Sequence, residues 1–407
     1  MPPRRRLAVL AAVAGPGLLA GLSDDDPAGI TTYSVLGADY GYRLLWVLLL
    51  STIALVLFHD LGARMGIVTG QGLTGLVREA YGIRPAALAV AALVLANLGT
   101  TCAEFAGVAA GFELFGVSRY ASVPLAAGAV SLLVLRGSFH RVERVLMLFS
   151  AVFVTYVVAG ITAGPDWGAA LHGTVAPTLP RSREAIALAT ATIGTTLAPW
   201  GLSFIQSYAA DKRLTVDELR YERVDVITGA CFTGIIGFFV VIACAATLNA
   251  EGVSINDAAD AARALEPIAG DLAGKRFGIG LIGAALLAAS ILPLSTAYSV
   301  SEFVGREAAL DDRPREAPLF YGTYGVIVTV GAALILIPGA PLVSILVLTQ
   351  ILNAILLLPL LAFMYGIARN PALMGEHVAT RSAAAGYLVA IAFIAVCVVS
   401  LALLSLP

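Results

Sequence analysis

The sequence predicts an all-helical protein that crosses a membrane many times, and three observations lead to this class. Of its 407 residues, 59% are hydrophobic and only 13% are charged, whereas soluble proteins carry roughly 25% charged residues. Apolar stretches long enough to cross a bilayer recur along the whole chain. Finally, most of the 25 Lys and Arg residues fall in alternate connections between these stretches. We therefore expect one transmembrane domain over residues 1–407.

Each predicted helix is an apolar stretch of about 20 residues, the length that spans a bilayer. The third and sixth stretches are longer, so they tilt or protrude. We expect the first and the sixth to be broken for the reasons given below. The eleven predicted helices cover residues 7–41, 43–62, 85–115, 120–136, 144–163, 184–209, 224–248, 276–303, 319–338, 341–367 and 383–405.

The distribution of positive charge predicts the orientation of the chain. Lys and Arg are enriched in cytoplasmic connections of membrane proteins. With eleven helices, the richer side of this chain is cytoplasmic if the N-terminus lies inside and the C-terminus outside. We expect an integral protein of the bacterial inner membrane in this orientation. Its partner is the lipid bilayer, and nothing in the sequence indicates nucleic acid or identifies a protein partner.

The first apolar segment is interrupted by the run Ser23-Asp24-Asp25-Asp26-Pro27-Ala28-Gly29. Charge within a membrane is costly and persists mainly where it serves an ion path. Pro27 removes a backbone donor and Gly29 loosens the helix. We therefore predict a helix broken at membrane depth, with carboxylates and free carbonyls facing inward. The alternative is a short loop outside the membrane after a signal-like segment.

A second break is predicted five helices later, at Ala198-Pro199-Trp200-Gly201. It repeats the x-Pro-x-Gly pattern of Asp26-Pro27-Ala28-Gly29, again near the middle of an apolar segment. An odd offset of five helices places the two halves of the chain in opposite membrane orientations. Paired helix breaks in inverted halves are typical of the central site of a transporter.

At these two breaks the chain resembles the Nramp family of divalent-metal transporters, whose signatures are Asp-Pro-Gly-Asn in the first helix and Met-Pro-His-Asn in the sixth. Further resemblance lies around the second helix and in the third and tenth, at 41–46, 63–70, 103–105 and 349–350. The resemblance implies a leucine-transporter-type fold. Its parts would be two inverted five-helix repeats, about 7–163 and about 184–367, and an extra helix at about 383–405.

The chain departs from the family signatures at the positions that matter most. Ala198 stands where the family has the methionine whose thioether selects transition metals, and Gly29 and Gly201 replace the two asparagines. Trp200 replaces the histidine tied to proton transport, and Thr101 replaces an acidic residue one turn before Glu104. With these substitutions, the chain resembles a diverged, magnesium-transporting branch related to the family.

Asp26 is the first candidate for direct or water-bridged binding of the cation, and its alternative role is a structural cap at the helix break. Asp24 and Asp25 would line the entrance or form a solvated vestibule. Carbonyl groups at the two breaks and the amide of Gln350 would add oxygens. The candidate metal site is therefore Ser23, Asp24, Asp25, Asp26, Gly29, Thr195, Ala198 and Gln350, and the pathway around it Thr101, Glu104, Trp200, Gly201 and Asn353.

These ligands are oxygens, which suit Mg²⁺ and Mn²⁺. All four histidines are expected near helix ends or in loops, and Trp200 cannot carry a proton, so we predict uptake by alternating access without proton coupling. The alternatives are a proton-coupled transporter of Mn²⁺ or another transition metal, and a sodium-coupled organic-cation symporter of the same fold. A cation channel is a third alternative. No nucleophile–base pair or phosphate-binding loop indicates an enzyme, and we expect no cofactor, because the metal ion is the substrate.

Overall fold

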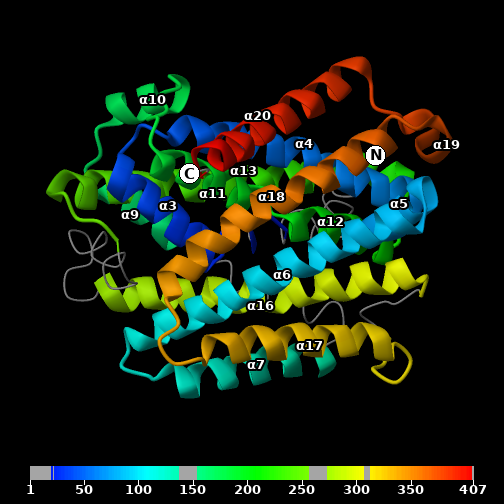
Figure 1. The fold of residues 1–407 in the computed structure, drawn as a ribbon, viewed down its shortest axis with the longest axis horizontal. Coiled ribbons are helices and arrows are strands. Elements are labelled where there is room, and N and C mark those ends of the chain that lie inside the picture. Colours follow the sequence, from blue (N-terminus) through cyan, green and yellow to red (C-terminus); the bar gives the residue numbers. More distant parts are fainter. Residues whose placement is uncertain (1–19, 22, 137–153, 256–272, 307–311, 406–407) are drawn as a thin grey trace, which may run out of the picture.

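The computed structural model describes residues 20–21, 23–136, 154–255, 273–306 and 312–405 (Figure 1). The described residues form helices and connecting loops, without strands. The longer helices are α3 (Pro27–Tyr40), α4 (Leu45–Thr69), α5 (Leu73–Tyr81), α6 (Ile83–Glu113), α7 (Arg119–Arg136), α9 (Val154–Thr162), α10 (Trp167–Val175), α11 (Arg183–Thr196), α12 (Pro199–Asp211), α13 (Leu219–Cys244), α16 (Ala273–Val304), α17 (Pro318–Ile335), α18 (Leu342–Ala368) and α20 (Arg381–Ser405). The short helix α19 (Pro371–Met374) precedes the last of these.

Eight helices among the described residues are long and apolar enough to cross a membrane, counting α11 and α12 as one broken span. Three further predicted segments correspond to α3, α7 and α9. Residues 7–19 and 22 of the first segment and 144–153 of the fifth lie outside the described part of the chain. The prediction of an all-helical, polytopic membrane protein is confirmed.

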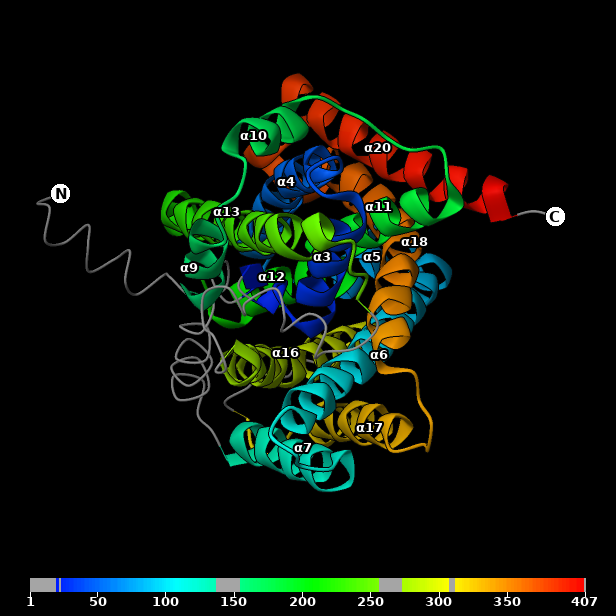
Figure 2. The same ribbon diagram turned by 90° about the vertical axis from the view of Figure 1, so that its left-hand side faces the viewer.

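The helices pack in layers around the two broken spans (Figures 1 and 2). α6 and α16 run side by side below the centre, and α7 and α17 form the layer beyond them. α10 and α20 lie on the opposite side of the molecule. In the span formed by α11 and α12, 94% of the apolar stretch is buried, against 17% in α20. The broken span is therefore the core, and α20 offers its apolar surface to lipid.

Both predicted breaks are present. Residues 20, 21 and 23 are helical, the chain leaves the helix at 24–26, and α3 begins at Pro27. In the other span α11 ends at Thr196 and α12 begins at Pro199. The residue before a proline is driven out of the helical region by the proline ring, and Asp26 and Ala198 are accordingly extended.

The structure corrects the predicted extent of the second span. We expected this helix to end at residue 62, but α4 continues for nearly two more turns to Thr69. Arg64, expected in a cytoplasmic connection, therefore lies within the helix, is 9% exposed and donates a hydrogen bond to the Tyr387 hydroxyl at 2.9 Å. An apolar pattern cannot show where a helix ends when a buried arginine finds a partner on a distant helix.

Candidate functional site

The three aspartates of the first break are buried, each at most 3% exposed. One Asp26 oxygen, Oδ1, accepts a hydrogen bond from the Gly29 amide at 2.6 Å, which makes Asp26 the N-cap of α3. The carboxyl oxygens of Asp24 and Asp25 have no hydrogen-bond partner among the described residues. The structural cap that we considered as the alternative role of Asp26 is thus formed. It uses one Asp26 oxygen and leaves the carboxyl oxygens of Asp24 and Asp25 without a partner among the described residues.

α6 brings a fourth carboxylate to the break. The carboxyl groups of Glu104 and Asp26 are neighbours, close enough for their charges to repel each other. Glu104 is fully buried, and neither of its oxygens has a hydrogen-bond partner among the described residues. The close approach of α6 depends on Gly107, because a side chain there would collide with the ring of Pro27. Two carboxylates this close repel each other unless a proton or a cation lies between them.

Oxygen atoms also converge on Gly29. A methyl group at this position would lie 2.8 Å from the Asp24 carbonyl oxygen, 3.1 Å from Thr195 Oγ1 and 3.3 Å from Asp26 Oδ1. Thr195 comes from the last turn of α11, and its hydroxyl has no hydrogen-bond partner among the described residues. We call Asp24, Asp26, Thr195 and Glu104 the oxygen cluster. It combines carboxylate, carbonyl and hydroxyl oxygens, the donor set that hard divalent cations prefer.

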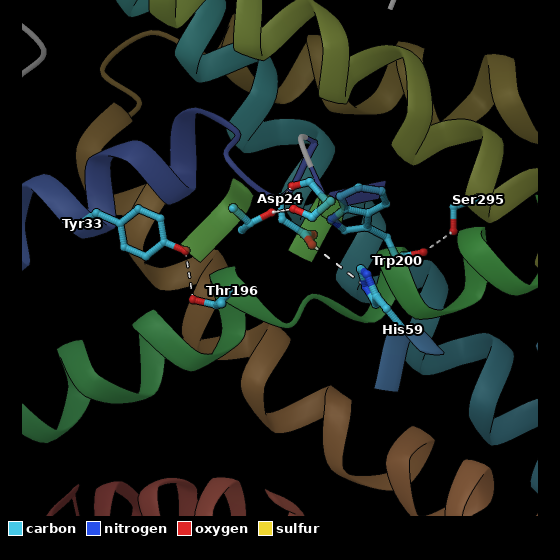
Figure 3. A network of polar contacts seen from close by, with 9 residues as sticks. Asp24, Tyr33, His59, Thr196, Trp200 and Ser295 are labelled. Atoms are coloured by element: carbon cyan, nitrogen blue, oxygen red, sulfur yellow. Dashed lines mark hydrogen bonds and ion pairs between the residues drawn. The ribbon is translucent and has the colours of Figure 1, made fainter. Parts of the chain in front are cut away.

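The second break has a different chemical character. Ala198 is the N-cap of α12, and its methyl group forms no capping hydrogen bond. The Trp200 carbonyl accepts a hydrogen bond from Ser295 Oγ of α16 at 2.9 Å (Figure 3). The Trp200 ring is buried, and its Nε1 has no partner among the described residues. This break contributes a large aromatic surface and backbone groups to the site.

His59 was wrongly expected near the end of its helix. Because α4 continues to Thr69, His59 lies in the helix interior and is fully buried. Its Nε2 is 4.0 Å from Asp24 Oδ2 (Figure 3), and neither ring nitrogen has a hydrogen-bond partner among the described residues. The sequence signal was available, because an ionisable residue inside an apolar stretch is a functional candidate by default.

Three predicted site residues, Gln350, Asn353 and Thr101, lie in contacts among α6, α17 and α18. The Gln350 amide oxygen accepts a hydrogen bond from Asn353 Nδ2 at 2.9 Å, and Asn353 also bonds to Thr100 of α6. The Thr101 methyl group faces Gly331 of α17. The structure therefore brings Asp24, Asp26, Gly29, Thr195 and Glu104 together and ties Gln350 into a network that joins α18 to α6.

Sequence reasoning also missed Tyr33, two turns beyond the first break. Its hydroxyl hydrogen-bonds with Thr196 Oγ1 at 2.9 Å and so joins α3 to α11, one from each predicted half of the chain (Figure 3). Tyr33 is fully buried, and the ring of Tyr33 packs against Gly237 of α13. This contact joins the two broken spans near the first break.

Among the described residues, no group of three or more His, Cys, Asp or Glu side chains is placed so that it could hold a metal ion. A cation at the oxygen cluster would thus be held by a few side chains together with carbonyl groups and water. The first turns of α3 and α12 both lie beside carboxylates, since Asp26 caps α3 and a methyl group at Gly201 would lie 3.4 Å from Asp24 Oδ1. Helix N-termini stabilise negative groups. Here those groups belong to the protein, which favours a cation over an anion as ligand.

A family profile described as natural resistance-associated macrophage protein-like matches residues 17–404. The chain belongs to the Nramp family. It is 30% identical over 385 residues to a divalent metal cation transporter MntH of Klebsiella pneumoniae, an alignment that covers 91% of this chain and 88% of the relative. A protein of the same description from Acidiphilium cryptum is 29% identical over 389 residues, covering 89% and 83%. These relatives are transporters, which agrees with the expectation that the chain is not an enzyme.

Solved structures show the same fold. The manganese transporter of Eremococcus coleocola superposes with a TM-score of 0.79 at 17% identity, covering 98% of this chain and 87% of the other. MhsT, solved in complex with L-phenylalanine, gives a TM-score of 0.61 at 17% identity, covering 96% and 97%. Both similarities support the leucine-transporter-type architecture, and the broken first and sixth helices agree with it.

Proposed function

We propose that this protein takes up the divalent cations Mg²⁺ and Mn²⁺ by alternating access, without coupling to protons. The main support for the proposal is the oxygen cluster at the first break. A carbonyl, a hydroxyl and a carboxylate oxygen lie 2.8–3.3 Å from the position of a methyl group at Gly29, and the Glu104 carboxylate is a neighbour of Asp26. The relatives described as divalent metal cation transporters and the manganese transporter of the same fold support the cation class.

The preference for Mg²⁺ rests on the donor atoms. Oxygen ligands suit hard cations, whereas soft sulfur ligands select transition metals. Ala198 offers no sulfur at the second break, and Gly29 and Gly201 offer no side chain at all. Mg²⁺ loses water reluctantly and is usually held by one or two carboxylates with several waters retained. Asp26 and Glu104 supply two such carboxylates, and Mn²⁺ is bound by the same oxygens.

The proposal that transport is uncoupled rests on Trp200, which cannot carry a proton at the position where the family has a histidine. A membrane potential of 100 mV, negative inside, contributes about 2.3 kcal/mol per charge to cation entry. Two charges therefore favour accumulation by about 4.6 kcal/mol without a co-transported ion. His59 lies beside the same site and is the described histidine that could connect transport to protons, so the test below includes internal pH.

The proposal includes the predicted topology, with the N-terminus in the cytoplasm of a bacterial cell and the C-terminus outside. The repeat division at about 7–163 and 184–367, with the extra helix at about 383–405, is part of the same proposal. The hydrogen bond between Tyr33 and Thr196 supports it, because it joins the two broken helices as corresponding parts of one central site.

The test is uptake by proteoliposomes that contain dyes for Mg²⁺, Mn²⁺ and protons, with wild type, Asp26→Asn and Asp39→Asn. Asp39 is an exposed carboxylate on the same helix and serves as the matched control. We expect saturable entry of both cations in wild type and Asp39→Asn. Uptake by Asp26→Asn should fall more than about 100-fold, since even outer-shell partners of a metal contribute 10–100-fold.

Three results would overturn parts of this proposal. Entry of Mn²⁺ without Mg²⁺ would contradict the Mg²⁺ assignment. Cation-dependent acidification above that of empty vesicles would show proton coupling. Uptake of spermidine in place of either metal would favour the organic-cation symporter.

A further inference from the structure

His59 and Asp24 form a buried pair that no hydrogen bond explains. The two side chains are fully buried, and the ring nitrogens and both carboxyl oxygens lack partners among the described residues. The 4.0 Å between Nε2 and Oδ2 exceeds the length of an N–H···O hydrogen bond. Leaving polar groups buried without partners costs free energy. A pair of this kind, facing each other at the helix break, therefore indicates a ligand held between them.

The separation suits a metal ion. Metal–nitrogen and metal–oxygen bonds of about 2.0–2.2 Å, with the two donors on opposite sides of the ion, span about 4.0–4.4 Å between the donor atoms. His59 is anchored in the interior of α4, and Asp24 lies at the break, one residue beyond the last helical turn. The two donors thus approach from different elements, as ligands of one ion do.

Gly201 keeps the space between the donors open. A methyl group at this position would lie 3.1 Å from His59 Nε2 and 3.4 Å from Asp24 Oδ1. Any side chain at 201 would enter the region that both donors face. Because Gly201 has no side chain, the region between the two donors stays free on the side of the second break. Asp24 belongs to both positions, with its carboxylate here and its carbonyl in the oxygen cluster.

We infer that His59 and Asp24 form a second cation position beside the oxygen cluster, and that it takes a first-row transition ion such as Mn²⁺ in preference to Mg²⁺. Imidazole nitrogen binds transition metals readily, whereas Mg²⁺ prefers oxygen. The oxygen cluster accepts both ions, and the nitrogen donor favours Mn²⁺ in the absence of a thioether. This inference rests on the proposed function and assigns the preference for transition ions at this second position to His59.

The test is pulsed electron paramagnetic resonance of the purified full-length protein loaded with one equivalent of Mn²⁺. A directly bound imidazole produces modulation from ¹⁴N nuclei. We expect this modulation in wild type and in His172→Gln, which changes an exposed histidine on α10, and its loss in His59→Gln. Wild-type protein labelled with ¹⁵N-histidine should show ¹⁵N lines instead, which tests the assignment without any substitution.

Binding measurements give the second readout. We expect His59→Gln to weaken Mn²⁺ binding at least about tenfold more than Mg²⁺ binding, and His172→Gln to change neither. Wild-type Mn²⁺ without nitrogen modulation would overturn the second position, and saturable uptake that depends on Asp26 would then leave the proposed function standing. Wild type that binds and transports neither Mn²⁺ nor Mg²⁺ would overturn both.

Discussion

The two helix breaks share one backbone geometry and differ in chemistry. Asp26 and Ala198 are both extended N-caps, with φ and ψ of −69° and 172° and of −81° and 143°. A proline follows each at the first helical position, where its missing N–H costs no helical hydrogen bond. The Asp26 side chain caps its helix at 2.6 Å, whereas the methyl group of Ala198 makes no cap.

The difference shows that a break by itself does not make an ion site. The first break places buried carboxylates against Glu104, while the second presents the Trp200 ring and a backbone carbonyl already bonded to Ser295. We infer that the first break supplies most of the charge that binds the cation. The second break supplies space, because Gly201 has no side chain, and the aromatic surface of Trp200. The predictions below test this division.

The largest effect is expected from alanine at the two equivalent glycines. The Gly29→Ala methyl group would lie 2.8 Å from a backbone carbonyl, whereas that of Gly201→Ala would meet the His59 side chain at 3.1 Å. Overpacking costs about 1–3 kcal/mol, and a backbone carbonyl yields less than a side chain. Uptake and thermal stability in detergent should therefore fall more in Gly29→Ala than in Gly201→Ala.

Gly322→Ala is the control, because nothing lies within 4 Å of a methyl group at that position of α17. It should keep uptake and stability near the wild-type level. Equal losses in Gly29→Ala and Gly201→Ala would contradict the expectation that the first break tolerates an added side chain less than the second.

A smaller effect is expected when the second break is given a ligand. Ala198→Met would place a soft thioether beside the site, and soft ligands favour Cd²⁺ over Mg²⁺. We expect the ratio of Cd²⁺ to Mg²⁺ affinity to rise about tenfold, which corresponds to about 1.4 kcal/mol. Isothermal titration with both ions measures it. Val326→Met, on an exposed position of α17, is the control, and an unchanged ratio in Ala198→Met would place residue 198 away from the cation.

The smallest effect concerns the hydrogen bond that holds the Trp200 carbonyl at the second break. Ser295→Ala removes the hydrogen bond to the Trp200 carbonyl, and a bond of this kind contributes about 1 kcal/mol. We expect a modest fall in the unfolding temperature with cation affinity retained. Ser290→Ala is matched, because that hydroxyl bonds within its own helix, to the Leu286 carbonyl at 2.7 Å. A loss of affinity in Ser295→Ala as large as that in Asp26→Asn would show that the second break binds the ion directly.

Much of this protein could be read from its sequence. Apolar length and the scarcity of charge determine membrane helices, since lipid leaves the backbone no partner outside the helix. Pro27 and Pro199 determine both breaks, because a proline ring excludes the helical conformation of the residue before it. Three aspartates inside an apolar segment indicated the candidate site, because buried charge is rarely tolerated without a function.

Only the tertiary structure decided which side chains meet. Glu104 is 78 positions from Asp26 along the chain, and His59 of α4 lies 4.0 Å from Asp24 at the first break. The amide oxygen of Gln350, a predicted ligand, accepts a hydrogen bond from Asn353 of its own helix. The local sequence pattern indicates the free energy of placing a residue in lipid or in a helix. Which distant groups meet in the buried interior depends on how the helices pack, and the periodicity of a single helix contains no information about that packing.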